Sequence, residues 1–91
     1  MRRVKATLVT SFEAEAPDEE QLNNLALWLD QTQFDGFEDV DYRFEYSLAG
    51  TIGCRVPGAL PRERLVALAS AIDQASALIV SKMAPRTQLV G

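Results

Sequence analysis

The sequence predicts an α+β domain in which two helices cover one face of a four-stranded antiparallel sheet. Alternating apolar and polar residues at 3–12, 38–48 and 52–56 are typical of half-buried strands. Two other segments carry apolar residues at helical spacing, and each begins near a proline. With 91 residues and a hydrophobic fraction of 47%, the chain can form one small core.

The first strand and first helix are predicted from residue spacing. The strand at 3–12 places these apolar residues on its inner side: Val4, Ala6, Leu8 and Phe12. Pro17 suits a first helical turn, and the acidic residues after it suit the positive end of the helix dipole. The apolar stripe of this helix consists of Leu22, Leu25, Ala26 and Leu29. Trp28 is expected at the flank of the stripe, and Leu27 near the polar side.

The strands at 38–48 and 52–56 are expected to form a hairpin. The inner face of the first strand is Val40, Tyr42, Phe44 and Tyr46. A three-residue loop at 49–51 would place Leu48 opposite Ile52 and keep the apolar residues of both strands together. Gly50 can supply the positive φ that such a loop commonly needs. This register predicts a cross-strand ion pair between Glu45 and Arg55.

The last third of the chain is predicted to hold the second helix and the fourth strand. Pro61 opens the helix, whose apolar stripe consists of Leu65, Leu68, Ala69, Ile72 and Ala75. Residues 77–83 are apolar and β-branched, which favours a strand, although periodicity also allows the helix to continue through them. Pro85 would end either element. We therefore expect a single domain at 1–84 and a C-terminal tail at 85–91.

The resulting order β-α-β-β-α-β resembles the ferredoxin-like arrangement, with both crossovers right-handed. The resemblance is one of pattern over most of the chain, and it names no family because this architecture serves many unrelated functions. It implies that the strand at 38–48 lies at an edge of the sheet, next to the first helix.

Composition excludes several chemistries. The chain has no histidine and one cysteine, Cys54, so it can form neither a Ser-His-Asp triad nor an internal disulfide. Zinc would need several such ligands, and the five glycines form no phosphate-binding loop. We expect Cys54 to be a core residue and the protein to be a non-enzymatic one without cofactor or metal. The absence of a continuous apolar run predicts no membrane association and a cytoplasmic location.

Charge is divided unevenly along the sequence. Residues 13–45 hold eleven acidic residues and one arginine, a net charge of −10, whereas the remainder carries +6. In the predicted fold this division becomes an acidic side, formed by the first helix and the strand at 38–48, and a basic side. Such a division affects partners and association rather than the fold.

The outer residues Asp39, Asp41 and Glu45 have two interpretations. Charge on an edge strand can protect it from pairing with other chains. The same carboxylates can instead bind a basic protein or nucleoprotein complex, occupying a surface that normally holds nucleic acid, as inhibitors encoded by phages and mobile elements do. The predicted partner-binding residues are Asp39, Asp41, Glu45, Glu20, Leu27 and Trp28.

Other functions fit the sequence less well. The carboxylate spacing matches no calcium loop, and a strand face lacks the cleft that an acid–base pair needs. Direct nucleic-acid binding through the open sheet face is an alternative, but the strand aromatics fall on the inner face and the net charge of −4 opposes it. A homo-oligomeric regulatory or ligand-binding domain is a further alternative, since opposed acidic and basic sides could meet head to tail.

Overall fold

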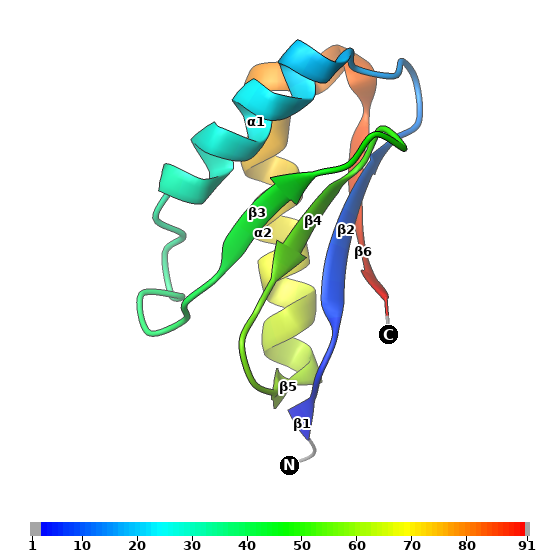
Figure 1. Cartoon of the computed structure of the whole chain (residues 1–91). Helices are drawn as coiled ribbons and strands as arrows, with labels where there is room; N and C mark the ends of the chain where they lie inside the picture. The colour runs from blue at the N-terminus through cyan, green and yellow to red at the C-terminus, as the bar shows by residue number, and fades with distance from the viewer. Residues whose placement is uncertain (1–2, 91) are drawn as a thin grey trace.

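The structure is a computed structural model that describes residues 3–90. Its elements are β1 (Arg3–Val4), β2 (Thr7–Phe12), α1 (Glu19–Gln31), β3 (Arg43–Tyr46), β4 (Ile52–Arg55), β5 (Leu60–Pro61), α2 (Arg62–Val80), the 3-10 turn η1 (Ser81–Met83) and β6 (Pro85–Val90). The main sheet has the order β3-β4-β2-β6 with every pair antiparallel, and β1 and β5 form a second, two-stranded sheet (Figure 1). The predicted α+β class, with two helices and a four-stranded antiparallel sheet, is confirmed.

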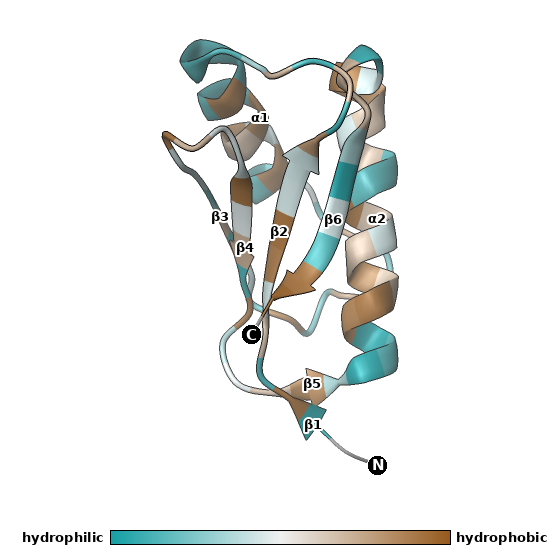
Figure 2. Cartoon of the chain, turned by 90° about the vertical axis from the view of Figure 1, so that its right-hand side faces the viewer, coloured by the Kyte–Doolittle hydropathy of each residue, from teal (hydrophilic) through white to brown (hydrophobic). Residues whose placement is uncertain are grey.

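The core lies between the helices and one face of the main sheet. Alternate residues of β2 and β4 are buried there, while their neighbours in sequence face the open side. Figure 2 shows polar and apolar residues interspersed along the strands and helices, the pattern of elements with one buried side. The residues at most 1% exposed include Leu8, Thr10, Leu25, Leu29, Ile52, Cys54, Leu65, Leu68 and Ile72. Thr10 is tolerated because its hydroxyl shares a 2.7 Å hydrogen bond with that of Thr87.

α1 begins at Glu19, two residues after Pro17, because Asp18 caps it, so the expectation that Pro17 lies in the first helical turn is wrong. The Asp18 carboxylate accepts a hydrogen bond from the Gln21 backbone N–H at 2.8 Å, and the Gln21 side chain accepts one from the Asp18 N–H at 2.9 Å. This capping box satisfies two backbone donors at the start of the helix. The predicted apolar stripe of α1 is buried as expected.

The strand predicted at 77–83 is wrong, because α2 continues to Val80 and ends in η1. Ser76 and Val80 extend the buried side of the helix, whereas Leu78 and Ile79 stay 80% and 54% exposed. Helical packing therefore outweighs the β-branched composition. The helical segment Arg62–Met83, in which an 18-residue window has a mean hydropathy of 1.4, is the one helix within residues 3–90 long and apolar enough to cross a membrane. The core helix of a soluble protein meets the same criterion, and α2 packs into the core here.

The fourth strand of the sheet is β6, so the predicted tail at 85–91 is wrong for residues 85–90; Gly91 lies outside the described residues. Ala84, with φ of 51°, reverses the chain direction after η1. β6 then pairs along the whole of β2, from Phe12↔Pro85 to Thr7↔Val90. Its inner residues are Thr87, which is buried, and Leu89, which is half-buried.

Two of the predicted strands are shorter than expected. The segment predicted at 38–48 is a strand only over Arg43–Tyr46, and residues 38–42 belong to the connection that follows α1. The segment at 3–12 divides into β1 and β2, because Arg3 and Val4 pair with Pro61 and Leu60 rather than with the main sheet.

The hairpin register differs from the predicted one by two residues. Tyr46 lies opposite Ile52 and Phe44 opposite Cys54, and the Ser47 N–H donates to the Thr51 carbonyl at 2.9 Å. The loop is therefore 48–50, and Gly50 has the expected positive φ of 88°. A shift of two residues keeps the same side chains of each strand on the buried face. The one predicted core residue that becomes exposed is Leu48, at 88%.

The predicted ion pair between Glu45 and Arg55 is accordingly wrong. Glu45 lies opposite Gly53, and the residue opposite Arg55 is Arg43.

Candidate functional site

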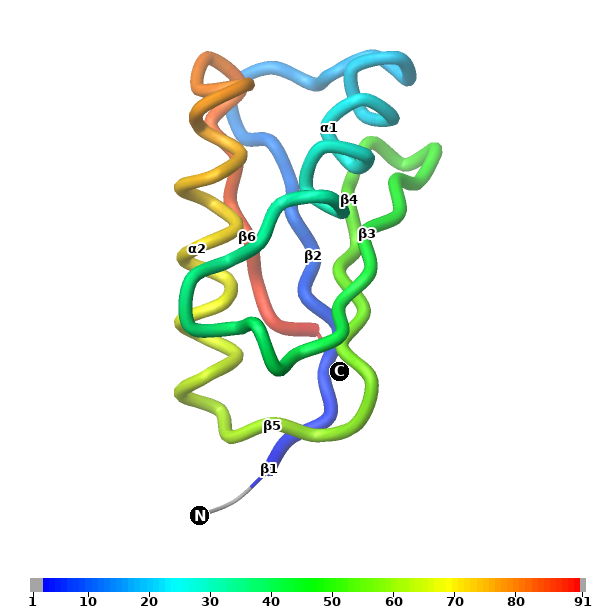
Figure 3. Tube along the Cα trace, turned by 90° about the vertical axis from the view of Figure 1, so that its left-hand side faces the viewer, coloured from blue at the N-terminus to red at the C-terminus, as the bar shows by residue number. Residues whose placement is uncertain are grey.

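α1, the 32–42 connection and β3 lie on one side of the molecule (Figure 1), and these segments carry exposed carboxylates. We call this surface the acidic flank; it comprises Asp18, Glu19, Glu20, Asp35, Glu38, Asp41 and Glu45. Arg43 is the one cation in this part of the sequence. Cations from outside this stretch also lie beside it: Arg64 pairs with Asp39, and Lys5 and Arg55 line a hollow together with Asp41 and Glu45. Figure 3 shows the connection looping from the end of α1 past α2 before it returns to β3.

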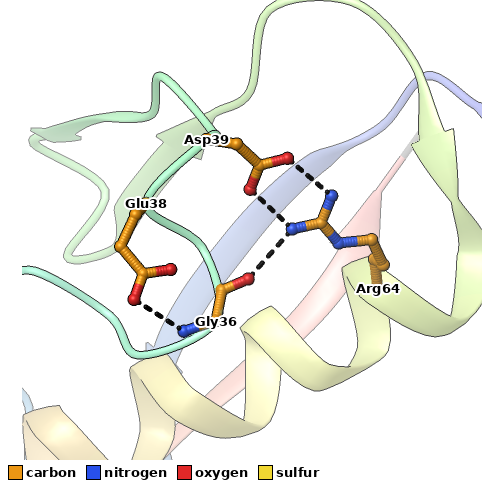
Figure 4. A network of polar contacts seen from close by, with 4 residues as sticks. All are labelled: Gly36, Glu38, Asp39 and Arg64. Atoms are coloured by element: carbon orange, nitrogen blue, oxygen red, sulfur yellow. Dashed lines mark hydrogen bonds and ion pairs between the residues drawn. The ribbon is translucent and has the colours of Figure 1, made fainter.

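Asp39 is placed apart from the other predicted site residues. Two nitrogens of Arg64 on α2 donate to its two carboxylate oxygens at 2.9 and 3.1 Å, and Arg64 also donates to the Gly36 carbonyl at 3.0 Å (Figure 4). The pKa of Asp39 is lowered chiefly by these hydrogen bonds, and the pKa of Arg64 is raised by them. Asp39 therefore fixes the connection to α2 and is already neutralised within the protein.

Aromatic side chains hold the rest of the connection. The Tyr42 hydroxyl accepts a hydrogen bond from the Phe34 N–H at 3.1 Å and donates to the Thr32 carbonyl at 2.9 Å. Its ring meets the Phe34 and Phe44 rings edge to face, with centroids 5.3 and 5.7 Å away. The Arg64 guanidinium lies 5.3 Å from the centroid of the Phe37 ring, within the range of a cation–π contact. The loop that carries Asp35 and Glu38 is thus tied down at several points.

The free edge of β3 is partly closed by α1. Asp30, near the end of the helix, accepts a hydrogen bond from the Phe44 N–H at 3.0 Å. A neighbouring strand would need that donor for its own ladder. The edge is therefore protected by a specific contact as well as by surrounding charge.

Glu20 lies at the start of α1, close to the end of β3. The Tyr46 hydroxyl donates to Glu19 at 3.1 Å, and this contact joins the helix N-terminus to the strand. The same carboxylate raises the pKa of Tyr46, mainly through the hydrogen bond. Carboxylates thus lie on both sides of the β3 edge, with Glu19 and Glu20 toward the helices.

Asp41 and Glu45 lie on the other side of this edge, toward the open face of the sheet. Both line a hollow at the start of β3 and the end of β4, and its lining also includes Arg43 and Arg55. The structure therefore brings Asp41 and Glu45 together, but it surrounds them with cations rather than extending them into a purely acidic row.

The two apolar residues predicted to bind a partner have different environments. Leu27 is 53% exposed on the outer side of α1 and can contact another molecule directly. Trp28 is half-buried and packs against the core, as expected for a residue that flanks the apolar stripe. Its backbone carbonyl also accepts a hydrogen bond from the Thr32 hydroxyl at 2.7 Å.

The described side chains provide neither an activated cysteine nucleophile nor a metal site. Cys54 is 1% exposed, and burial, with a smaller contribution from Asp30, raises the pKa of its thiol to about 12. A thiol of this kind is protonated near neutral pH and is a poor nucleophile. Within residues 3–90 no group of three metal-ligating side chains is placed to hold an ion.

Comparison with known proteins identifies no relative of this chain. No protein-family model, no curated protein and no solved structure matches the chain. The proposals below accordingly depend on the geometry and charge of the described residues.

Sequence reasoning missed the residues that organise the site. The sequence indicates no role for Arg64, because its partner Asp39 lies 25 positions away in the chain and residue spacing cannot reveal that contact. Asp30 looked like an ordinary residue at the end of a helix. Phe34 and Phe37 are buried on either side of the turn at Asp35 and Gly36. Two aromatic residues beside a turn are the one sequence feature that indicates that this segment packs against the core.

Proposed function

We propose that this protein is a non-enzymatic binding domain whose acidic flank docks on a basic surface of a protein or nucleoprotein partner. The observation that supports the proposal is seven exposed carboxylates carried by the start of α1, the 32–42 connection and β3, in a stretch of sequence whose one cation is Arg43. Such a potential attracts a cationic surface and orients it during encounter. Asp39 contributes less charge to this surface, because it is paired with Arg64, although its side chain stays 69% exposed.

The centre of the docking surface in this proposal is the β3 edge. Glu20 approaches the edge from the helix side, and Asp41 and Glu45 approach it from the open face. Because Asp30 occupies the Phe44 N–H, recognition depends on side chains rather than on addition of a strand. Leu27 supplies an exposed apolar contact on the same side of the molecule.

The kind of partner follows from the charge. A surface that binds nucleic acid displays clustered Lys and Arg for phosphate oxygens, and carboxylates can occupy the same positions. We therefore propose that the partner surface is one that otherwise binds nucleic acid, and that the domain acts as its inhibitor or competitor. The buried, unpaired Cys54 suits a reducing compartment, and we place the protein in the cytoplasm.

We also propose that the fold is a variant of the ferredoxin-like arrangement. The order β3-β4-β2-β6 supports this assignment when β6 takes the place of the last strand. The added β1-β5 pair, the long α2 and the short β3 depart from the simple pattern.

The proposal is tested by affinity capture from a nuclease-treated lysate of the source organism. Wild type is compared with Glu20→Lys and Glu45→Lys, and with Glu63→Lys on α2 as a control that changes net charge equally outside the flank. The proposal expects a basic protein that wild type and the control retain, that both flank variants lose, and that added nucleic acid releases. Equal retention by all four proteins, or retention that nucleic acid does not affect, would contradict it.

A further inference from the structure

The open face of the main sheet carries two arginines directly opposite one another. Arg43 on β3 pairs with Arg55 on β4, and Arg55 lies next to Thr7 on β2 in the same row. Like charges opposite each other in a ladder are destabilising. Among the carboxylates of residues 3–90, none lies within 4.0 Å of either guanidinium, so no ion pair offsets the repulsion.

These arginines border a hollow of about 630 Å³. Lys5, from the link between β1 and β2, adds a third cation to its lining, and Ala6, Pro57 and Val90 give it apolar surface. The volume falls within the range of small-molecule sites, which combine apolar lining with a few placed polar groups. Thr7 and Arg55 in its lining place the hollow where β2 enters the sheet and β4 leaves it.

We propose that this hollow binds a small anionic ligand, with an oxyanion held between Arg43 and Arg55 and an apolar body against Pro57 and Val90. Guanidinium groups match the oxygen geometry of carboxylates and phosphates. An anion between the two arginines replaces their mutual repulsion with two attractions. The hollow shares Asp41 and Glu45 with the acidic flank, but the proposed ligand contacts are Arg43, Arg55, Pro57 and Val90, so this inference does not depend on the proposed partner.

The surroundings of the hollow favour a small ligand over a nucleic acid. Asp41 and Glu45 stand in its lining and would repel a polyanion that continued past it. The aromatic side chains in and beside β3 pack into or against the core: Tyr42, Phe44 and Tyr46. They therefore present no rings for base stacking on the open face. A single compact anion carries its charge at one end and meets less of this repulsion than a polyanion that continues past the hollow.

The test is titration of the isotope-labelled protein, followed by backbone amide chemical shifts, with four probes at millimolar concentration. Octanoate and octyl phosphate carry the two candidate head groups on one apolar body, octanol lacks the charge, and inorganic phosphate lacks the apolar body. The proposal expects saturable shifts at Thr7, Arg43, Arg55 and Val90 with octanoate or octyl phosphate, and the tighter of the two identifies the head group. Octanol should give no saturable shift there, and inorganic phosphate should bind more weakly.

Variants separate specific binding from general attraction. Arg43→Gln and Arg55→Gln should each weaken binding by about tenfold, the loss expected for a charge-assisted hydrogen bond. Arg62→Gln on α2 makes the same chemical change outside the hollow and should leave the affinity unchanged. Each hollow variant should also raise the Tm of the ligand-free protein, since it removes the repulsion. The proposal is overturned if neither anion gives a saturable shift, if octanol binds equally well, or if both hollow variants bind as wild type does.

Discussion

Arg64 and Asp39 form a bidentate ion pair that joins α2 to the connection between α1 and β3. The same guanidinium reaches the Gly36 carbonyl, so three hydrogen bonds hold this loop. Arg64→Gln should therefore increase amide hydrogen exchange over residues 36–40 while leaving α1 and β2 protected. Arg62→Gln, two positions earlier on the same helix, is the matched control and should leave exchange unchanged. Equal exchange in both variants would show that the pair does not hold the loop.

The Asp39–Arg64 pair also predicts a pH dependence. The pKa of Asp39 in the folded protein is lowered below its ordinary value of 3.8, chiefly by hydrogen bonds from Arg64. The ionised carboxylate therefore stabilises the folded state above that value, and this contribution is lost as the pH falls through the folded pKa. Urea unfolding, followed through the fluorescence of the single Trp28, should show wild type more stable than Asp39→Asn at neutral pH. The difference should vanish in acid, and a constant difference would contradict the assignment.

Tyr42 should contribute more to stability than its neighbour Tyr46. Tyr42→Phe removes a partly buried hydroxyl that bonds the Phe34 N–H and the Thr32 carbonyl, so unfolding free energy should fall by about 1–3 kcal/mol. Tyr46→Phe makes the same chemical change at an exposed contact with Glu19 and should have little effect. Chemical denaturation of the two variants checks this order, and a larger loss in Tyr46→Phe would reverse it.

The hairpin register is testable through charge. In the observed register Arg55 faces Arg43, so Arg55→Glu replaces a repulsion with an attraction and should stabilise the protein by about 0.2–1 kcal/mol. Arg55→Gln separates relief of repulsion from the new attraction and should fall between the two. A double-mutant cycle between Glu45 and Arg55 should give weaker coupling than one between Arg43 and Arg55. Stronger coupling of Glu45 to Arg55 would restore the register that the sequence predicts.

Cys54 should be chemically inert in the folded protein. Burial raises the pKa of its thiol to about 12, so the thiolate is scarce at mildly alkaline pH. Iodoacetamide should label the chain promptly in denaturant and only at the rate of unfolding in buffer. The neutral thiol should also stabilise the fold below its ordinary pKa of 9.0, an effect lost as the pH rises toward about 12. Fast labelling without denaturant would contradict the burial.

Local patterns predicted the elements whose burial follows a regular period. The stripe from Leu22 to Leu29 and the inner residues Ile52 and Cys54 are where helical and strand spacing place them. The hairpin register was wrong because Leu48 was assigned to the core, although a shift of two residues retains the same face. Residues 77–83 have a strand-like composition but continue the buried side of α2, and only tertiary packing decides between the two.

The candidate site was predictable only in part, because long-range contacts set its charges. Asp41, Glu45, Glu20 and Leu27 are exposed as expected. No spacing rule links Asp39 to Arg64, whose guanidinium pairs with the charge of this exposed carboxylate. Likewise, Arg43 lies opposite Arg55 only in the observed hairpin register. The pattern of buried residues does not distinguish this register from one shifted by two residues.

The central claim is that the acidic flank, through carboxylates on both sides of the β3 edge, binds a basic partner. Its most direct test is the affinity of the captured partner for wild type, Glu20→Lys, Glu45→Lys and Glu63→Lys at low and high salt. We predict that the two flank variants bind about tenfold more weakly at low salt, that Glu63→Lys binds as wild type does, and that salt weakens wild type most. Binding that neither flank variant nor salt changes would contradict the claim.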